Sequence, residues 1–212
     1  TDYVYLNGYY GIGTLGGGMF YKDTESLESD NGGTIIVDGD GIRWKRANVH
    51  EEYHASWFGI STDIDDNSPL IQNALNVMPT NTILIFGPGI YECKQTIVVP
   101  DQSGMYVKAI SLQGSVKRSG YSKTIGTMLK YTGPNPDTLT PFIDFRGSTG
   151  DKRYLASISD MIFEGPGKDS NIVGLWFYIA VNCVFERTSC YDFKNGIQID
   201  NYFYYAYFND VA

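Results

Sequence analysis

Cysteine and histidine are scarce in this sequence of 212 residues. The three cysteines, Cys93, Cys183 and Cys190, lie among apolar neighbours without a Cys-x-x-Cys spacing, and an odd number argues against a complete disulfide framework. We therefore expect buried free thiols, which pack as small apolar groups. The two histidines, His50 and His54, could share a helical face, but no third metal ligand lies on that face. The sequence predicts neither a metal site nor another cofactor.

Positive charge is also in short supply, with 16 Lys and Arg residues against 24 Asp and Glu residues and a net charge of −8. Nucleic-acid binding relies on basic side chains that neutralise phosphates, so nucleic acid is not an expected partner. A polyanionic glycan would likewise require a local basic patch. Four basic residues are candidates for such a patch, although an exposed charged loop explains them more simply: Lys117, Arg118, Lys123 and Lys130.

Long apolar runs are absent, and nothing approaches the roughly 18 residues that a membrane-spanning helix requires. The Thr-Asp-Tyr start has no signal-peptide pattern and no initiator Met, and the chain ends within a strand-like pattern at residues 209–212. We expect a soluble protein without a membrane partner. We also expect it to be a fragment or processed piece of a longer chain.

Aromatic residues and glycine are abundant instead, with 17 Tyr, 11 Phe, 3 Trp and 24 Gly. Aromatic side chains fit pleated surfaces, and glycine supplies turns with positive φ, so the composition favours strands and turns. The hydrophobic content of 42% is sufficient for a sizeable core. The length suggests one or two domains.

Residues 1–56 are expected to form a small leading β region. The β-branched run at 34–37 and the apolar run at 42–46 flank a turn rich in Gly and Asp at 38–41, which is the signature of a β-hairpin. Residues 57–212 are predicted to form a second unit.

One amphipathic helix is predicted over residues 69–78. The segment 65–68 offers side-chain oxygens for an N-cap, and Pro69 suits the first helical position. Apolar residues recur on one face between 70 and 78, and Pro79 then ends the pattern.

Short apolar runs follow this helix, and Gly and Pro interrupt them repeatedly. No second helical pattern appears, which excludes a doubly wound α/β sheet because its strands must alternate with crossover helices. The runs that we expect to be strands are 83–86, 96–99, 110–112, 127–129 and 142–145.

The last part of the sequence repeats. Residues 174–177 resemble 196–199 at an offset of 22, and residues 185–188 align with 208–211 at an offset of 23. Residues 158–161 align in turn with residues 185–188, at an offset of 27. A repeat of 20 to 50 residues is typical of a solenoid, and a unit of this size made only of strands is one turn of a parallel β-helix.

Inward positions of neighbouring turns should stack in columns. The alignment places Met161, Thr188 and Val211 in one column, with Phe163 and Cys190 in the next. A solenoid end without a cover leaves unpaired strand groups and a bare core. The helix that directly precedes the first strand is therefore predicted to be a cap.

Two sets of segments resemble known families. The segments 57–59, 65–75 and 85–91 resemble the opening module of pectate-lyase-like β-helices, in which an Asp-Asp turn starts a helix with an Ile-Gln-x-Ala-Leu core and a strand Phe-Pro-x-Gly-x-Tyr follows. Residues 110–114 and 158–165 are similar to that family's turn consensus. The leading segments are similar to what precedes the β-helix in phage tail spikes: 16–21, 31–36 and 44–46.

The resemblance implies an all-β fold, a right-handed parallel β-helix (solenoid) with a short N-terminal capping helix and a small leading β region. It also implies a homotrimeric tail spike in the virion, joined to the phage tail or baseplate through a more N-terminal region. Such a spike recognises and depolymerises bacterial surface polysaccharide, either capsule or lipopolysaccharide, during host attachment. Two alternatives are a trimeric receptor-binding spike without catalysis and a pectate-lyase-like enzyme that does not come from a phage.

The repeat also indicates where glycan chemistry would lie. Asp160, Arg187 and Asp210 fall in one outward column, and Glu164 and Glu186 are expected to lie close to it. A glycoside hydrolase requires two carboxylates about 5 to 9.5 Å apart, and a lyase requires a base together with a cation that stabilises the enolate. These five residues are the catalytic candidates. A ladder of alternating charges that stabilises stacked strands is the interpretation that we favour, and the fragment is expected to lack the complete active site.

A dense aromatic cluster lies at residues 202–208. Consecutive residues of a strand point to opposite faces, so part of the cluster must be exposed. Exposed rings can stack on sugars or pack against another subunit of a trimer. We favour packing in a trimer.

Overall fold

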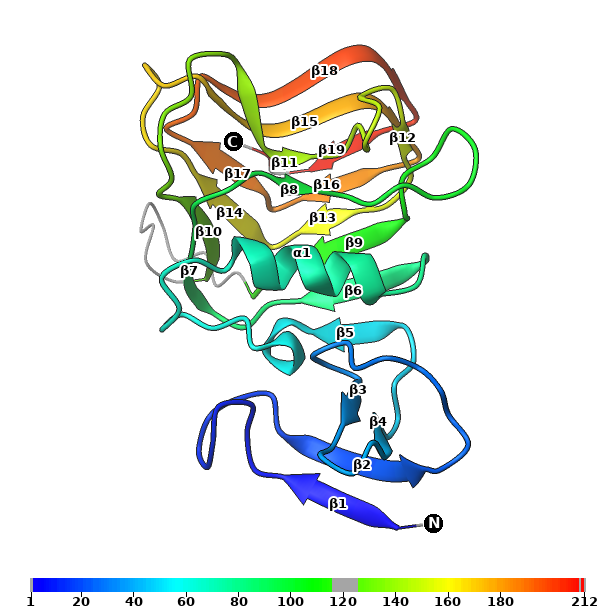
Figure 1. Ribbon diagram of the computed structural model, residues 1–212. Coiled ribbons are helices and arrows are strands. Elements are labelled where there is room, and N and C mark those ends of the chain that lie inside the picture. Colours follow the sequence, from blue (N-terminus) through cyan, green and yellow to red (C-terminus); the bar gives the residue numbers. More distant parts are fainter. Residues whose placement is uncertain (1, 116–125, 210, 212) are drawn as a thin grey trace.

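The computed structural model describes residues 2–115, 126–209 and 211, and nearly all its elements are strands (Figure 1). The leading sheet holds β1 (Tyr3–Leu6), β2 (Gly18–Asp23), β3 (Ile35–Val37) and β4 (Arg43–Arg46). These strands pair antiparallel in the order β1-β2-β4-β3. The pairing of β3 with β4 confirms the predicted hairpin.

Asp38 closes the turn of this hairpin. Its carboxylate accepts hydrogen bonds from the backbone N–H of Ile42 at 2.9 Å and from Nε1 of Trp44 at 2.8 Å. Ile36 lies opposite Trp44 in the register. A short polar side chain thus fixes the turn, which is the usual role of Asp at such positions.

Arg46 joins the leading sheet to the segment that follows it. Its guanidinium donates to the carbonyls of Gly16 and Gly17, both at 2.8 Å, and lies 4.5 Å from the ring centroid of Trp57. It is 7% exposed, so these bonds satisfy donors that water cannot reach. The contact with Trp57 crosses the predicted boundary at residue 56, which stays a prediction.

The remaining strands form three parallel sheets. The first sheet holds β5 (Glu52–His54), β6 (Thr82–Ile85), β9 (Ile110–Gln113), β13 (Ile158–Ser159), β16 (Val184–Glu186) and β19 (Tyr207–Asn209). The second holds β7 (Gly89–Cys93), β10 (Thr127–Tyr131), β14 (Met161–Glu164) and β17 (Ser189–Tyr191). The third holds β8 (Ile97–Val98), β11 (Thr140–Asp144), β12 (Arg153–Tyr154), β15 (Ile172–Val181) and β18 (Asn195–Tyr204).

From β6 onward the chain visits these three sheets in rotation, and each strand pairs in parallel with its counterpart one turn later. In Figure 1 the turns stack upward from β5 and β6 to β18, above the leading sheet. The predicted offsets are confirmed, since Leu175 lies opposite Ile197 and Phe185 lies opposite both Ile158 and Phe208. The predicted neighbours Phe163 and Cys190 also face each other. The all-β composition and the parallel stacking of turns are therefore as predicted.

Aromatic side chains stack inside the turns. The rings of Phe145 and Phe177 are 4.5 Å apart between centroids and nearly parallel, at 11°. Both side chains are fully buried, as is Phe185, whose ring meets Phe177 edge-on. Full burial of one such side chain contributes about 1.5–3 kcal/mol, so this aromatic stack is a main source of stability.

The α-helix α1 (Ser68–Val77) begins and ends one residue earlier than predicted. Its buried face packs against η1 (Ala55–Phe58) and β8. Asn67, at the N-cap, makes no side-chain cap bond, but Asp66 accepts the backbone N–H of Ser68, the first helical residue, at 3.0 Å. Asp66 and Ser68 also both accept the backbone N–H of Lys94 beyond β7. These bonds tie the start of the helix to the second sheet. In the described part of the chain no helix has the length and apolar character needed to cross a bilayer.

All three cysteines are free. Cys93 and Cys183 are buried as predicted, whereas Cys190 is only half-buried. Cys190 lies on β17, which among the described strands has a parallel neighbour on one side alone. The expectation of burial is therefore wrong in part for this residue.

Candidate functional site

Three of the five predicted catalytic residues meet at one corner of the stack. Asp160 lies between β13 and β14, and Arg187 lies at the equivalent place one turn later, between β16 and β17. Their φ angles are positive, 57° and 47°, so each residue turns the chain from one sheet into the next. Arg187 donates from Nε and Nη2 to the two carboxylate oxygens of Asp160, at 2.5 and 2.8 Å, and from Nη1 to Glu186.

In this corner cluster (Asp160, Glu186 and Arg187) one guanidinium is shared by two carboxylates, which leaves a net charge of −1. The hydrogen bond with Asp160 and the nearby carboxylates raise the pKa of Arg187 further above its ordinary value. Both oxygens of Asp160 are engaged in a bidentate pair, so neither is directed toward an incoming glycosidic bond. The geometry supports a ladder of charges between turns. An acid or base role for the five residues stays a prediction.

The other two candidates do not join the corner cluster. Glu164 lies at the far end of β14, about 13 Å from Asp160 at the usual rise of about 3.3 Å per residue. There it forms an ion pair with Lys130 of β10 at 3.1 Å, and the two residues face each other in the register. Asp210 lies outside the described residues.

The predicted basic patch is not assembled by the described residues. Lys117, Arg118 and Lys123 lie outside them, and Lys130 is paired with Glu164. Between residues 2 and 115 and from 126 onward, as far as the structure describes them, no three His, Cys, Asp or Glu side chains are grouped to bind a metal.

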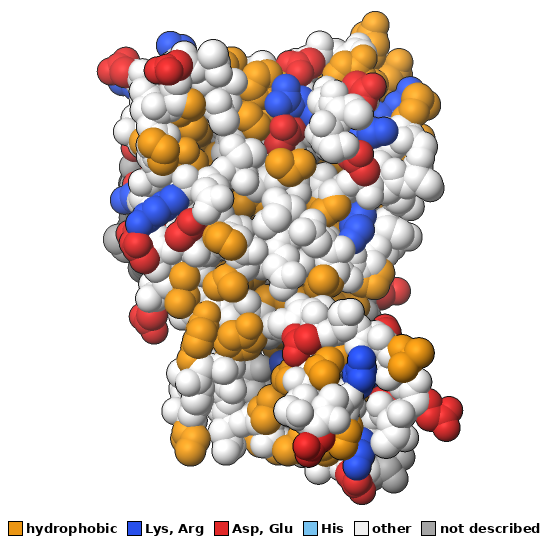
Figure 2. Space-filling model, viewed as in Figure 1, with side chains coloured by type: hydrophobic (Ala, Val, Ile, Leu, Met, Phe, Trp, Pro, Cys, Tyr) orange, Lys and Arg blue, Asp and Glu red, His pale blue; other side chains and the backbone are white. Residues whose placement is uncertain are grey.

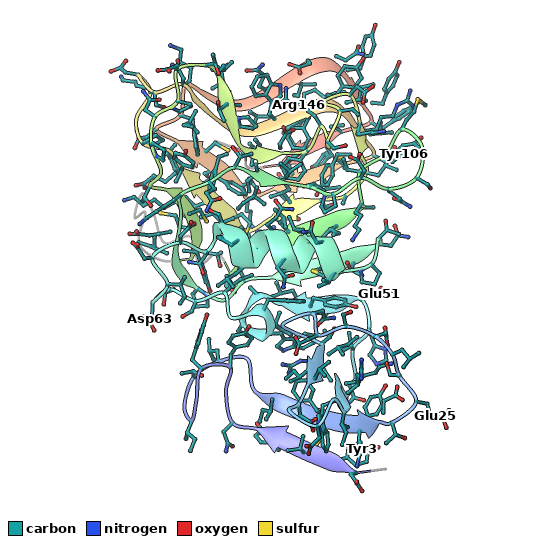
Figure 3. The ribbon with its side chains drawn as sticks, in the orientation of Figure 1. Tyr3, Glu25, Glu51, Asp63, Tyr106 and Arg146 are labelled. Atoms are coloured by element: carbon teal, nitrogen blue, oxygen red, sulfur yellow. The ribbon has the colours of Figure 1, made fainter. Side chains whose placement is uncertain are left out.

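A second cluster, which the sequence did not suggest, lies on the outer face of the third sheet. Arg146, labelled in Figure 3, donates to both carboxylate oxygens of Asp144 at 2.9 Å, and its guanidinium lies 3.8 Å from the ring centroid of Trp176. Trp176 donates from Nε1 to Asp200 at 2.9 Å, and Asp200 is also 3.7 Å from Arg146. Two carboxylates and one tryptophan thus hold this arginine in place.

The same face carries a groove of about 310 Å³ farther along β15 and β18. Polar, aromatic and aliphatic side chains from three strands and two loops line it: Met105, Asp151, Lys152, Arg153, Tyr178, Ile179, Asn201, Tyr202 and Tyr204. Figure 2 shows apolar side chains at the upper right of the molecule with charged side chains beside them. We call this hollow the tyrosine groove.

A β-bulge shapes the tyrosine groove. Phe177 lies opposite Ile199, but Ile179 lies opposite Tyr202, so Asp200 and its successor together oppose a single residue of β15. Such a bulge bends the strand and redirects side chains, and bulges are common beside active sites. Here the bulge lies opposite Tyr178 of β15, and both Tyr178 and the next residue, Ile179, line the groove.

The groove presents exposed tyrosines and one arginine. Tyr202 and Tyr204 are 56% and 51% exposed, and their ring centroids are 5.8 Å apart. Arg153 lies opposite Ile179, which in turn lies opposite Tyr202. A cation, an apolar side chain and an aromatic ring therefore occupy neighbouring positions on three adjacent strands. Tyr202 and Tyr204 of the predicted aromatic cluster therefore face outward, whereas the ring of Phe208 stacks on the buried Phe185, 4.8 Å away between centroids. No sequence signal marked Arg153, because β12 is two residues long and lies outside the repeat.

Residues 1–49 match the family described as the phage tail protein small four-stranded beta-sheet domain. The four strands of the leading sheet lie within this range. The match covers the leading sheet alone.

A curated relative matches about half of the chain. The capsule K2-specific depolymerase of Klebsiella phage vB_KpnP_KpV74 is 31% identical over 117 residues, which is 53% of this chain. The resemblance to phage tail spikes is confirmed. This chain spans 19% of the length of that relative, about a fifth.

Solved structures share the fold at low sequence identity. The tailspike protein of Acinetobacter phage vB_ApiP_P1 has a TM-score of 0.65 and 14% identity over 99% of this chain, which spans 35% of that protein. The tailspike protein of Acinetobacter baumannii phage AM24 has a TM-score of 0.59 and 20% identity over 94% of this chain and 30% of its own. A glycan biofilm modifying enzyme of Pantoea stewartii, with a tailspike-like parallel β-helix, has a TM-score of 0.57 and 16% identity. The match covers 88% of this chain and 30% of that enzyme. The parallel sheets described above are thus of the tail-spike type.

Proposed function

We propose that this chain is a segment of a phage tail spike that binds bacterial surface polysaccharide, capsule or lipopolysaccharide, through the outer face of its third sheet. The observation that carries the proposal is the tyrosine groove, in which exposed Tyr202 and Tyr204 lie beside polar groups in one hollow. Sugar sites combine apolar ring surfaces with a few polar groups that fix orientation. The 31% sequence identity with a capsule-specific depolymerase supports a bacterial polysaccharide as the ligand.

The complete spike, in this proposal, depolymerises the polysaccharide that it binds. The corner cluster has no free acid and base pair, since Arg187 holds both Asp160 and Glu186. We therefore assign chain cleavage to residues outside the 212 residues of this segment, and we assign binding to the segment itself. The five candidates, Asp160, Glu164, Glu186, Arg187 and Asp210, would then be structural.

The assembly completes the proposal. The three sheets would close into a right-handed solenoid whose first turn is capped by α1, since the buried face of this helix packs against η1 and β8. The spike would be a homotrimer of the virion tail. The leading sheet would face the tail, because Tyr3 and Tyr5 are 63% and 62% exposed on β1 and offer an apolar surface for a protein neighbour.

The test uses the full-length spike and purified capsular polysaccharides and lipopolysaccharides. Binding is measured by surface plasmon resonance, and cleavage by the loss of polymer size and the ultraviolet absorbance of unsaturated uronate, which marks a lyase. The variant Tyr202→Ala/Tyr204→Ala should weaken binding and raise KM at least tenfold, with kcat within about twofold of the wild type, because stacking contributes to binding and not to chemistry. Tyr205→Ala is the matched control, since Tyr205 is 87% exposed and does not line the groove.

The results separate the alternatives. If the wild-type spike binds polysaccharide without shortening it, the protein is a receptor-binding spike without catalytic activity. Loss of binding in the control as well as in the double variant would mean that the groove is not the site. No binding by the wild-type spike to any of these polymers would overturn the proposal.

A further inference from the structure

We infer that the tyrosine groove binds an acidic sugar unit, with the carboxylate of a uronic acid at Arg153 and the sugar ring against Tyr202. This inference rests on the proposed function and adds the class of sugar. It comes from the row of Arg153, Ile179 and Tyr202, which crosses β12, β15 and β18 at one position of the register.

The charge of Arg153 lacks the compensation that other arginines of the stacked turns receive. Arg146 is bound to Asp144, and Arg187 is bound to Asp160. Among the residues that the structure describes, no carboxylate lies within ion-pair distance of the Arg153 guanidinium, whose nearest recorded aromatic partner is Tyr106 at 5.9 Å. A half-buried guanidinium without a counter-charge keeps its donors available for charge-assisted hydrogen bonds to an anion.

The backbone holds Arg153 rigidly in this position. Its N–H donates to the carbonyl of Met105 at 2.8 Å, and its carbonyl accepts the N–H of Val107 at 3.1 Å. The loop that carries Tyr106, labelled in Figure 3, is thereby joined to β12 on both sides of this residue. A guanidinium on a fixed strand gives directed, two-pronged recognition of a carboxylate.

The spacing of the row leaves room for a sugar ring. Neighbouring strands are about 4.8 Å apart, so the backbones of Arg153 and Tyr202 are about 10 Å apart with Ile179 between them. Ile179 is 5% exposed and forms an apolar floor, while Tyr202 is 56% exposed and forms a wall. Asn201 also lines the groove and can donate to and accept from hydroxyl groups.

Two other charged groups of the groove do not change the assignment. Lys152 donates to the carbonyl of Gly104 at 3.0 Å and is partly neutralised by its attraction to Asp101. Asp151 accepts a hydrogen bond from Thr149 within its own exposed loop. The sequence as a whole carries a net charge of −8, which repels polyanions. Recognition of an acidic glycan therefore depends on a local cation, and Arg153 is that cation in the groove.

The experiment measures binding of the full-length spike to glucuronate-containing capsular polysaccharides and to the same polymers after chemical reduction of their carboxyl groups. Carboxyl reduction should weaken binding to the wild type about ten- to hundredfold, the range of a hydrogen-bonded charge pair. The Arg153→Gln variant should bind the acidic polymer more weakly than the wild type by the same factor, and it should bind the reduced polymer as tightly as the wild type does. Lys168→Gln is the charge-matched control, because Lys168 is exposed and does not line the groove.

Four outcomes would overturn the inference. Equal binding of acidic and reduced polymers by the wild type would overturn it and leave the proposed function intact. Equal losses on both polymers in Arg153→Gln would show that the arginine acts through packing alone. A smaller oligomer in Arg153→Gln with unchanged glycan binding would assign the site to a carboxylate of a second copy of the chain. No binding of any polymer by the wild type would overturn the proposed function and the inference together.

Discussion

The carboxylate of Asp160 receives two hydrogen bonds from the guanidinium of Arg187, across two neighbouring turns. Replacing Arg187 by Gln removes this bond and leaves Asp160 and Glu186 as like charges at one corner. We expect the apparent melting temperature of the full spike to fall by roughly 2–4 °C, with kcat on polysaccharide unchanged. Scanning calorimetry and a depolymerisation assay measure the two quantities.

The exposed Lys168, changed to Gln, serves as the control for loss of one positive charge and should leave the melting temperature unchanged. A fall in kcat of about a hundredfold or more at an unaltered melting temperature would contradict this prediction, because general acid–base groups contribute by that factor. The corner cluster would then be catalytic, as the alternative interpretation of the sequence has it.

The second prediction concerns the contribution of the buried aromatic stack to stability. Phe177 is fully buried and lies between Phe145 and Phe185, with centroids 4.5 and 5.5 Å away. Phe177→Ala should cost about 3–5 kcal/mol, since it removes a large side chain from a site where three turns pack together. Chemical denaturation of the full spike, followed by the near-ultraviolet circular dichroism of the stack, measures the change.

Leu27→Ala provides the comparison for this stack, because Leu27 is 88% exposed and lies far from the stacked turns in the sequence. It should cost well under half as much, since less area leaves water when it packs. Similar losses from the two variants would mean that the stack is not the main source of stability.

The third prediction concerns pH. The hydrogen bond from Trp44 lowers the pKa of Asp38 below 3.8, with a further contribution from the N–H of Ile42. The unfolded chain then binds this proton more readily than the folded hairpin does. The stability that Asp38 contributes is therefore fully present above its unfolded pKa and is lost as the pH falls through its lowered folded pKa.

Hydrogen-exchange protection of residues 35–46 should accordingly decrease as the pH falls below about 4, and Asp38→Asn should remove most of that decrease. Asp137→Asn is the control, because Asp137 is exposed and lies far along the chain from the hairpin. Unchanged pH dependence in Asp38→Asn would show that other carboxylates control the acid stability of the leading sheet.

Repeats and local patterns predicted much of the fold. The alignment of Leu175 with Ile197 and of Phe185 with Phe208 follows from spacing alone, because stacked parallel strands require the same register in every turn. Pro69 and the apolar period located α1 to within one residue. The leading strand β1 was not foreseen, since Tyr3–Leu6 is short and largely exposed and has no core period.

The tyrosine groove could not be predicted in the same way. It depends on a bulge that breaks the repeat opposite Tyr178 and on β12, a strand of two residues that pairs beside β15. Neither feature has a periodic signature, because both are departures from the period. The sequence did place Asp160 and Arg187 in one column, but it could not show that their side chains bind each other.

The thiols make the last prediction. Burial raises the pKa of Cys93 and of Cys183 to about 12, and both side chains are fully buried. A thiol must lose its proton to attack an alkylating reagent, so at pH 8 only about one molecule in ten thousand is reactive. Native spike treated with iodoacetamide should therefore carry no label at either residue, as peptide mass spectrometry would show, whereas spike unfolded in urea should be labelled completely. Labelling of Cys93 in the native protein would mean that the first turn opens beneath α1, because Cys93 ends β7 directly before the residues that bind the start of that helix.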